Sequence, residues 1–130
     1  MKTQILLLRI AGVINLFFMI FHLSFYKIFA WNTGLNCLSS DNRSIMLTYH
    51  AVSILLLGFM ALIPLAQARS LISSPIKYTL LSFFSLFYLV RIVTEFTLFG
   101  FAGIQSLIIL AMCIVPMVLF AIPLFHNPER

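Results

Sequence analysis

Four ionisable side chains stand out in this sequence because each lies inside a long apolar run: His22, His50, Arg91 and Glu95. Imidazole and carboxylate groups exchange protons or bind metal ions, and a guanidinium binds anionic or carbonyl groups. Placing an Arg or Asp at the centre of a membrane-spanning helix costs about 2.5–3.5 kcal/mol on insertion scales, so such residues persist where they face partners or a functional site. These four residues are therefore the centre of our candidate site.

The composition predicts an integral membrane protein. Of the 130 residues, 62% are apolar and 8% are charged, and the mean hydropathy is +1.12. A soluble domain is about 45–50% apolar and about 25% charged. A soluble enzyme, a disordered tail and a disulfide scaffold are therefore excluded. The net charge of +5 comes from Lys and Arg residues that are scattered singly, so we expect no nucleic-acid partner.

Four segments are long enough to span a bilayer, which takes about 20 mostly apolar residues. They cover about 5–30, 45–66, 76–99 and 104–125. Their short connections favour antiparallel neighbours. The sequence thus predicts an all-α fold, an antiparallel bundle of four transmembrane helices that forms a single transmembrane domain over residues 1–130.

Local residue types predict how these helices begin and end. Asp41 or Asn42 is expected to cap the second helix, and Ser74 followed by Pro75 is typical of a helix start. Gly100 is expected to end the third helix, and Gly103 to form the tight reversal that follows. Gly12 and Gly58 are expected to permit close approach of helices.

The distribution of Lys and Arg predicts the orientation, because cytoplasmic connections carry more of them. Two basic residues, Lys27 and Arg43, fall on one side of the predicted bundle. Five fall on the other side with both termini: Lys2, Arg9, Arg69, Lys77 and Arg130. We expect a multi-pass protein of a bacterial inner (plasma) membrane with both termini in the cytoplasm.

The four ionisable residues are expected to lie close together, because their depths in the membrane are similar. Counted from the outer end of its own helix at 1.5 Å per residue, each lies about 7–14 Å below the same boundary. Four further polar side chains lie on the same helix faces or beside them and are second choices for the site: Asn15, Tyr26, Tyr49 and Tyr88. The simplest arrangement is one buried polar pocket in the outer half of the bilayer.

Several roles for this pocket stay open, and the sequence assigns no reaction. The pocket could bind a small lipophilic or anionic ligand, or relay protons. Alternatively, His22 and His50 could be axial ligands of a haem b, or they could hold a divalent metal together with Glu95. A third reading is structural: the polar groups satisfy one another, and the chain is a homodimer or an accessory subunit of a larger membrane complex.

Overall fold

The computed structural model describes residues 1–125, and every regular element within that range is a helix. The long helices are α1 (Lys2–Leu23), α4 (Ser40–Ser73), α5 (Ile76–Thr97) and α6 (Ile104–Phe125). Three single turns connect α1 to α4: α2 (Phe25–Ile28), α3 (Trp31–Gly34) and η1 (Leu35–Cys37). Each long helix is long and apolar enough to cross a membrane. The expected all-α fold with four spanning helices is confirmed.

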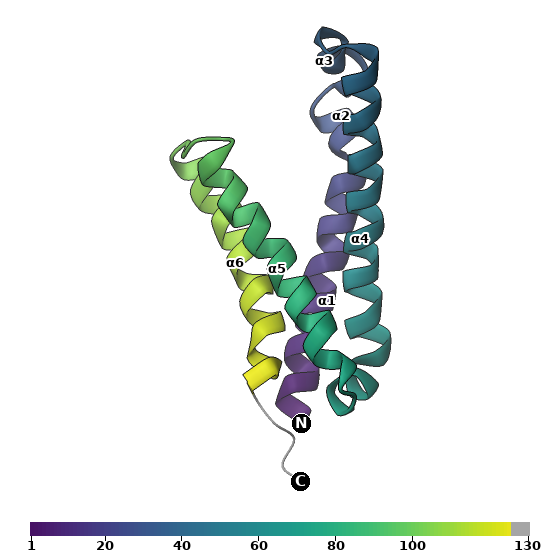
Figure 1. Ribbon diagram of the computed structural model, residues 1–130, viewed down its shortest axis with the longest axis vertical. Helices are drawn as coiled ribbons and strands as arrows, with labels where there is room; N and C mark the ends of the chain where they lie inside the picture. The colour runs from purple at the N-terminus through teal and green to yellow at the C-terminus, as the bar shows by residue number, and fades with distance from the viewer. Residues whose placement is uncertain (126–130) are drawn as a thin grey trace.

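The four helices pack as two antiparallel hairpins, α1 with α4 and α5 with α6, and α1 also contacts α6. Figure 1 shows the hairpins close together at the end where the N-terminus lies, here named the closed end. They diverge toward the end that holds the α5–α6 turn, here named the open end, and there the α1–α4 hairpin extends beyond the other. The arrangement is therefore a V rather than a bundle that is closed along its whole length.

Close packing of α1 on α4 depends on Gly12. A Cβ atom at this position would lie 2.8 Å from Cγ of Leu65 and 3.1 Å from the carbonyl oxygen of Ala61. Both distances are shorter than ordinary van der Waals contact, so a larger residue would push the helices apart. At Gly58 a Cβ atom would lie 3.1 Å from the sulfur of Met19. The predicted role of these glycines in helix approach is borne out.

The first connection differs from the prediction. Helix α1 ends at Leu23 rather than near residue 30, because the chain continues from Ser24 in separate turns. The cap of α4 is Ser39, whose Oγ accepts the backbone N–H of Asn42 at 3.3 Å. Asp41 and Asn42 are thus wrong as the predicted cap, and α4 begins at Ser40. Helix α4 also continues past residue 66 to Ser73, with a non-helical residue at Gln67.

The other two connections are close to the prediction. Helix α5 begins at Ile76 with Pro75 as its N-cap, one residue later than predicted, and the Oγ of Ser74 accepts the backbone N–H of Ile76 at 3.3 Å. Gly100 and Gly103 have φ of +64° and +69°, a backbone region that glycine adopts without steric cost. The turn that they make carries no charged side chain between residues 97 and 106. Its exposed side chains include Leu98, Phe99 and Phe101.

Candidate functional site

A buried hydrogen bond marks the vertex of the V. The hydroxyl of Tyr88 on α5 donates to Oδ1 of Asn15 on α1 at 2.8 Å, and Nδ2 of Asn15 donates to the carbonyl oxygen of Ala11 at 2.8 Å. Both Asn15 and Tyr88 are buried. The ring of Phe18 lies beside them, 6.4 Å from the ring of Tyr88 between centres. Two second-choice residues from distant parts of the sequence are thus brought together.

An ion pair forms on the α5–α6 hairpin, one turn nearer the open end. Nη1 of Arg91 lies 2.9 Å from Oε2 of Glu95, and the side chain of Arg91 is 33% exposed whereas that of Glu95 is 3% exposed. The other carboxylate oxygen, Oε1, accepts the hydroxyl of Ser106 at 2.6 Å. The oxygen of Ser106 in turn accepts the backbone N–H of Ala102 at 2.9 Å. Glu95 is therefore held from both α5 and α6, and the network extends to the turn.

The guanidinium of Arg91 has unused hydrogen-bond donors. It has five N–H donors. Among residues 1–125 its one ionic partner is Glu95, and the buried Nη1 forms no hydrogen bond of good geometry even with Glu95. The ring of Phe99 covers one face of the group, with its centre 4.9 Å from Cζ. The remaining donors are thus available to a further hydrogen-bond acceptor.

The two histidines lie together on the other hairpin. Nδ1 of His22 is 2.8 Å from the carbonyl oxygen of Phe18, and because a carbonyl only accepts, this nitrogen carries the proton. The imidazole centres of His22 and His50 are 6.1 Å apart. Phe25 stacks on His22 with centres 4.3 Å apart, and Trp31 meets His50 edge-on at 4.7 Å. The pair is therefore packed within an aromatic cluster.

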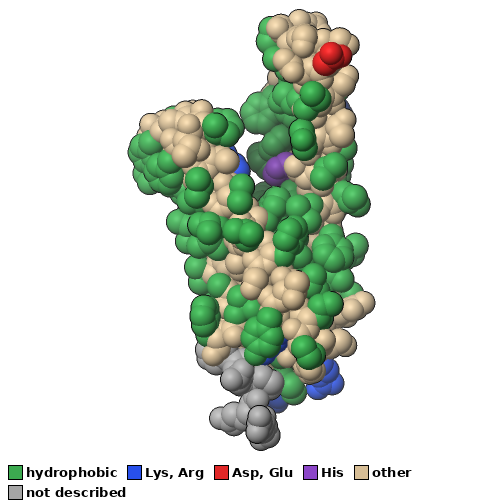
Figure 2. Space-filling view, in the orientation of Figure 1, with side chains coloured by type: hydrophobic (Ala, Val, Ile, Leu, Met, Phe, Trp, Pro, Cys, Tyr) green, Lys and Arg blue, Asp and Glu red, His purple; other side chains and the backbone are tan. Residues whose placement is uncertain are grey.

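The histidines and the ion pair lie on different walls of a hollow. Figure 2 shows the molecule hollowed between the hairpins toward the open end, with a histidine on the α1–α4 wall and a basic side chain on the α5–α6 wall. Between Tyr88 and the open end, Arg91 is the one basic residue of α5, so it is the basic side chain on this wall. His22 and Arg91 each lie one helical turn beyond the vertex contact between Phe18 and Tyr88. Within residues 1–125, no hydrogen bond, ion pair or ring contact joins His22 or His50 to Arg91 or Glu95.

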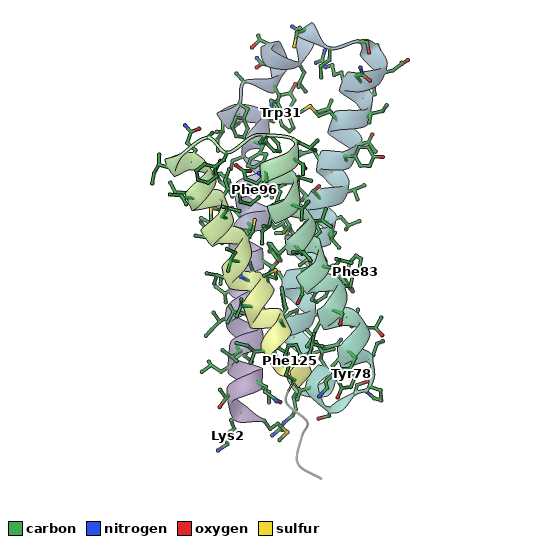
Figure 3. The ribbon with its side chains drawn as sticks, turned by 60° about the vertical axis from the view of Figure 1, so that its left-hand side comes forward. Lys2, Trp31, Tyr78, Phe83, Phe96 and Phe125 are labelled. Atoms are coloured by element: carbon green, nitrogen blue, oxygen red, sulfur yellow. The ribbon has the colours of Figure 1, made fainter. Side chains whose placement is uncertain are left out.

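The sequence predicted that the four ionisable residues share one pocket. In the structure they form two separate clusters, the histidine pair on one hairpin and the ion pair on the other. Tyr26 is 45% exposed and Tyr49 is 69% exposed, and within residues 1–125 no hydrogen bond or ring contact joins either of them to the four ionisable residues. The predicted face that held Tyr26 assumed a helix that continues past Leu23, and Tyr49 precedes His50 by one residue, which is about 100° around a helix. Figure 3 places Trp31 toward the open end, with Lys2, Tyr78 and Phe125 toward the closed end.

Sequence reasoning missed the aromatic partners of the site. Phe25 packs on His22 and Phe99 on Arg91, and neither was among the candidate residues. A signal exists in the spacing, because Phe25 follows His22 by three residues and Phe99 follows Arg91 by eight, which is about two helical turns. Ser106, which donates to Glu95, was not among the candidate residues either.

The expected His/His/Glu metal set is wrong. In the part of the chain that the structure describes, no three His, Cys, Asp or Glu residues are close enough to hold a metal ion together. The physical reason is the divergence of the hairpins. It separates Glu95 from the two histidines, although all three lie at a similar depth along their helices.

The histidine pair does not accommodate a haem either. A porphyrin bound by both imidazoles must lie between them, around the midpoint of the pair. The ring of Phe25 occupies that region, since its centre is 4.3 Å from that of His22 and 5.5 Å from that of His50. Arg43, a basic residue near the start of α4 that could otherwise pair with a haem propionate, donates to Oδ1 of Asn36 at 3.2 Å.

We therefore expect the purified protein to show no haem spectrum. A reduced-minus-oxidised absorbance spectrum of protein expressed with added haem precursor checks this, and it should lack both the Soret band and the sharp α and β bands. A Soret band that disappears in both His22→Ala and His50→Ala would contradict the expectation. A band that is unchanged in those variants would report haem bound elsewhere.

Comparisons of the chain with known protein families, with curated proteins and with solved structures found no match in any of the three.

Proposed function

We propose that this protein is a multi-pass inner-membrane protein that binds a small lipophilic ligand in the hollow between its hairpins. The ligand's polar head group would lie against Arg91, and its apolar part would extend toward lipid. Four helices that are long and apolar enough to cross a membrane support the membrane location. The many large apolar side chains on the outer faces, such as Phe17, Leu55 and Leu62, support it as well.

The proposed orientation places both termini in the cytoplasm. Its support is the Lys and Arg distribution, since Lys2 and Arg9 begin α1 while Arg69 and Lys77 flank the α4–α5 connection. Arg130 lies outside the described residues. In this orientation the hollow opens toward the outer leaflet, and the α5–α6 turn faces outward.

The observation that carries the proposal is the state of Arg91. Its charge is already balanced by Glu95, which is buried, yet the Arg91 side chain remains one-third exposed. A guanidinium that faces a low-dielectric region with most of its N–H donors unused is costly. A ligand with an acceptor oxygen removes that cost, and Arg is suited to bind such groups through two parallel hydrogen bonds.

The experiment compares what co-purifies with three proteins. Wild type, Arg91→Gln and Arg69→Gln are purified in mild detergent, extracted with organic solvent, and the extracts are compared by mass spectrometry. Arg69→Gln removes the same charge at an exposed position of α4. We expect one lipophilic compound, enriched over bulk lipid in wild type and in Arg69→Gln, to fall at least about tenfold in Arg91→Gln, which corresponds to about 1.4 kcal/mol of lost binding.

Each variant must elute from a sizing column at the same volume as wild type, which shows that it is folded. If Arg91→Gln fails this requirement, Arg91→Lys replaces it, because lysine keeps the charge but not the planar pair of donors. An identical set of extracted compounds in all folded variants would contradict the proposal. So would extracts that contain only bulk lipid.

A further inference from the structure

We infer that the ligand's head group is an uncharged ring that carries carbonyl or hydroxyl oxygens, as in isoprenoid quinones and quinols, and not an anion. This inference rests on the proposed function and narrows its ligand class. It depends on three observations: the charge balance at Arg91, the hydrogen-bonding atoms on the two walls, and the depth and aromatic character of the hollow.

The charge balance disfavours an anionic head group. Arg91 and Glu95 neutralise each other at 2.9 Å, and no further cation of the described residues pairs with Glu95. A bound carboxylate or phosphate would therefore give this region a net negative charge, which a low-dielectric environment penalises strongly. A neutral carbonyl oxygen accepts the same hydrogen bonds from Arg91 and adds no net charge.

The two walls offer complementary atoms to such a ring. On one wall, Arg91 offers N–H donors. On the other, His22 uses its Nδ1–H for the carbonyl oxygen of Phe18, so in the neutral imidazole Nε2 carries a lone pair and accepts hydrogen bonds. No hydrogen bond to that Nε2 is formed within residues 1–125. A ring with a carbonyl on one side and a hydroxyl on the other can therefore pair with both walls.

The depth of the hollow points the same way. Arg91 precedes Thr97, the last residue of α5, by six residues, which places it about 9 Å below the end of that helix. A phospholipid keeps its phosphate at the membrane surface, whereas a neutral ring partitions into the apolar region. At the vertex below the hollow the rings of Phe18 and Tyr88 pack on each other with centres 6.4 Å apart, and Phe25 stacks on His22 with centres 4.3 Å apart. Aromatic rings at these positions suit offset or edge-on packing against a flat ligand.

The test uses Trp31, the only tryptophan of the chain, which lies 4.7 Å from His50 between ring centres. Its fluorescence is followed while detergent-exchanged protein is titrated with one of two quenching probes. The first probe is a benzoquinone with a decyl tail, and the second is a stearate labelled with a nitroxide. Both are lipophilic, and only the second has an anionic head group.

We expect the benzoquinone to quench Trp31 saturably in wild type and in Arg69→Gln, with an affinity at least about tenfold lower in Arg91→Gln and in His22→Ala. The labelled stearate should quench without saturation, equally in all four proteins. Arg91→Lys replaces Arg91→Gln if the latter does not fold.

The other outcomes distinguish failure of the neutral-ring inference from failure of the proposed function. Saturable quenching by the labelled stearate alone, lost in Arg91→Gln, would overturn the neutral-ring inference and leave the proposed function standing. Saturable quinone binding that is unaffected by both the Arg91 and the His22 substitutions would place the ligand elsewhere and overturn both. The absence of saturable quenching by either probe would also overturn both.

Discussion

Replacing Glu95 with leucine is expected to lower the apparent melting temperature of the detergent-solubilised protein by about 10 °C. The substitution removes the one carboxylate that balances Arg91 and the acceptor of the Ser106 hydroxyl. Breaking a buried ion pair by deleting one partner is more harmful than deleting both, because the remaining charge has no partner in an apolar environment. Thermal unfolding followed by circular dichroism measures the change.

Two further variants separate the causes of this loss. Arg91→Met combined with Glu95→Leu removes both charges, and it should recover most of the lost melting temperature. Ser106→Ala keeps the ion pair and loses the two hydrogen bonds of the hydroxyl, to Glu95 and from Ala102, so its effect should be smaller than that of Glu95→Leu. A double variant that is as unstable as Glu95→Leu would show that the ion pair is not the source of the effect.

Replacing Tyr88 with phenylalanine is expected to lower the free energy of unfolding by about 1–2 kcal/mol. The hydroxyl is buried and donates to Oδ1 of Asn15 at 2.8 Å. Removing it leaves that oxygen without a donor at the point where the two hairpins meet. The change in the free energy of unfolding can be measured by titration with a denaturing detergent.

A double-mutant cycle with Asn15→Ala tests whether the two residues act as a pair. If they do, Tyr88→Phe should cost much less in the Asn15→Ala background than in wild type. Tyr49→Phe is the matched control, because it removes the same hydroxyl from a tyrosine of α4 that is 69% exposed. Fully additive effects of Asn15→Ala and Tyr88→Phe would show that the hydrogen bond does not hold the vertex.

The number and order of the four long helices follow from the sequence, because a run of about 20 apolar residues has few alternatives to a spanning helix, although the ends of α1 and α4 lie elsewhere. Two residues with a special backbone role were also predictable, since Gly100 and Gly103 adopt positive φ. The cap at Ser39 was less predictable, since Ser39, Ser40, Asp41 and Asn42 are all competent caps. Choosing among them requires the geometry of the preceding turns.

The candidate site was predictable along each helix but not between hairpins. Helical spacing and depth placed His22 and His50 at one level and Arg91 one turn from Glu95, and these residues form two pairs, whereas the contact of Asn15 with Tyr88 was not predicted. The angle between two hairpins depends on side-chain packing at their contact, here Phe18 with Tyr88 and Phe59 with Phe84. Depth along a helix carries no information on that angle, so one expected pocket became a hollow with two different walls.

The uncharged turn between α5 and α6 has a consequence for biogenesis. If both termini are cytoplasmic, this turn is the part of the second hairpin that must be translocated, and from residue 97 to residue 106 it carries no charge. Arg91 and Glu95 can enter as a neutral pair within one helix. The second hairpin can thus be inserted as a unit at little electrostatic cost, whereas the first connection must carry Lys27, Asp41 and Arg43 across. Insertion of the first hairpin is therefore the step that should depend on the translocation machinery.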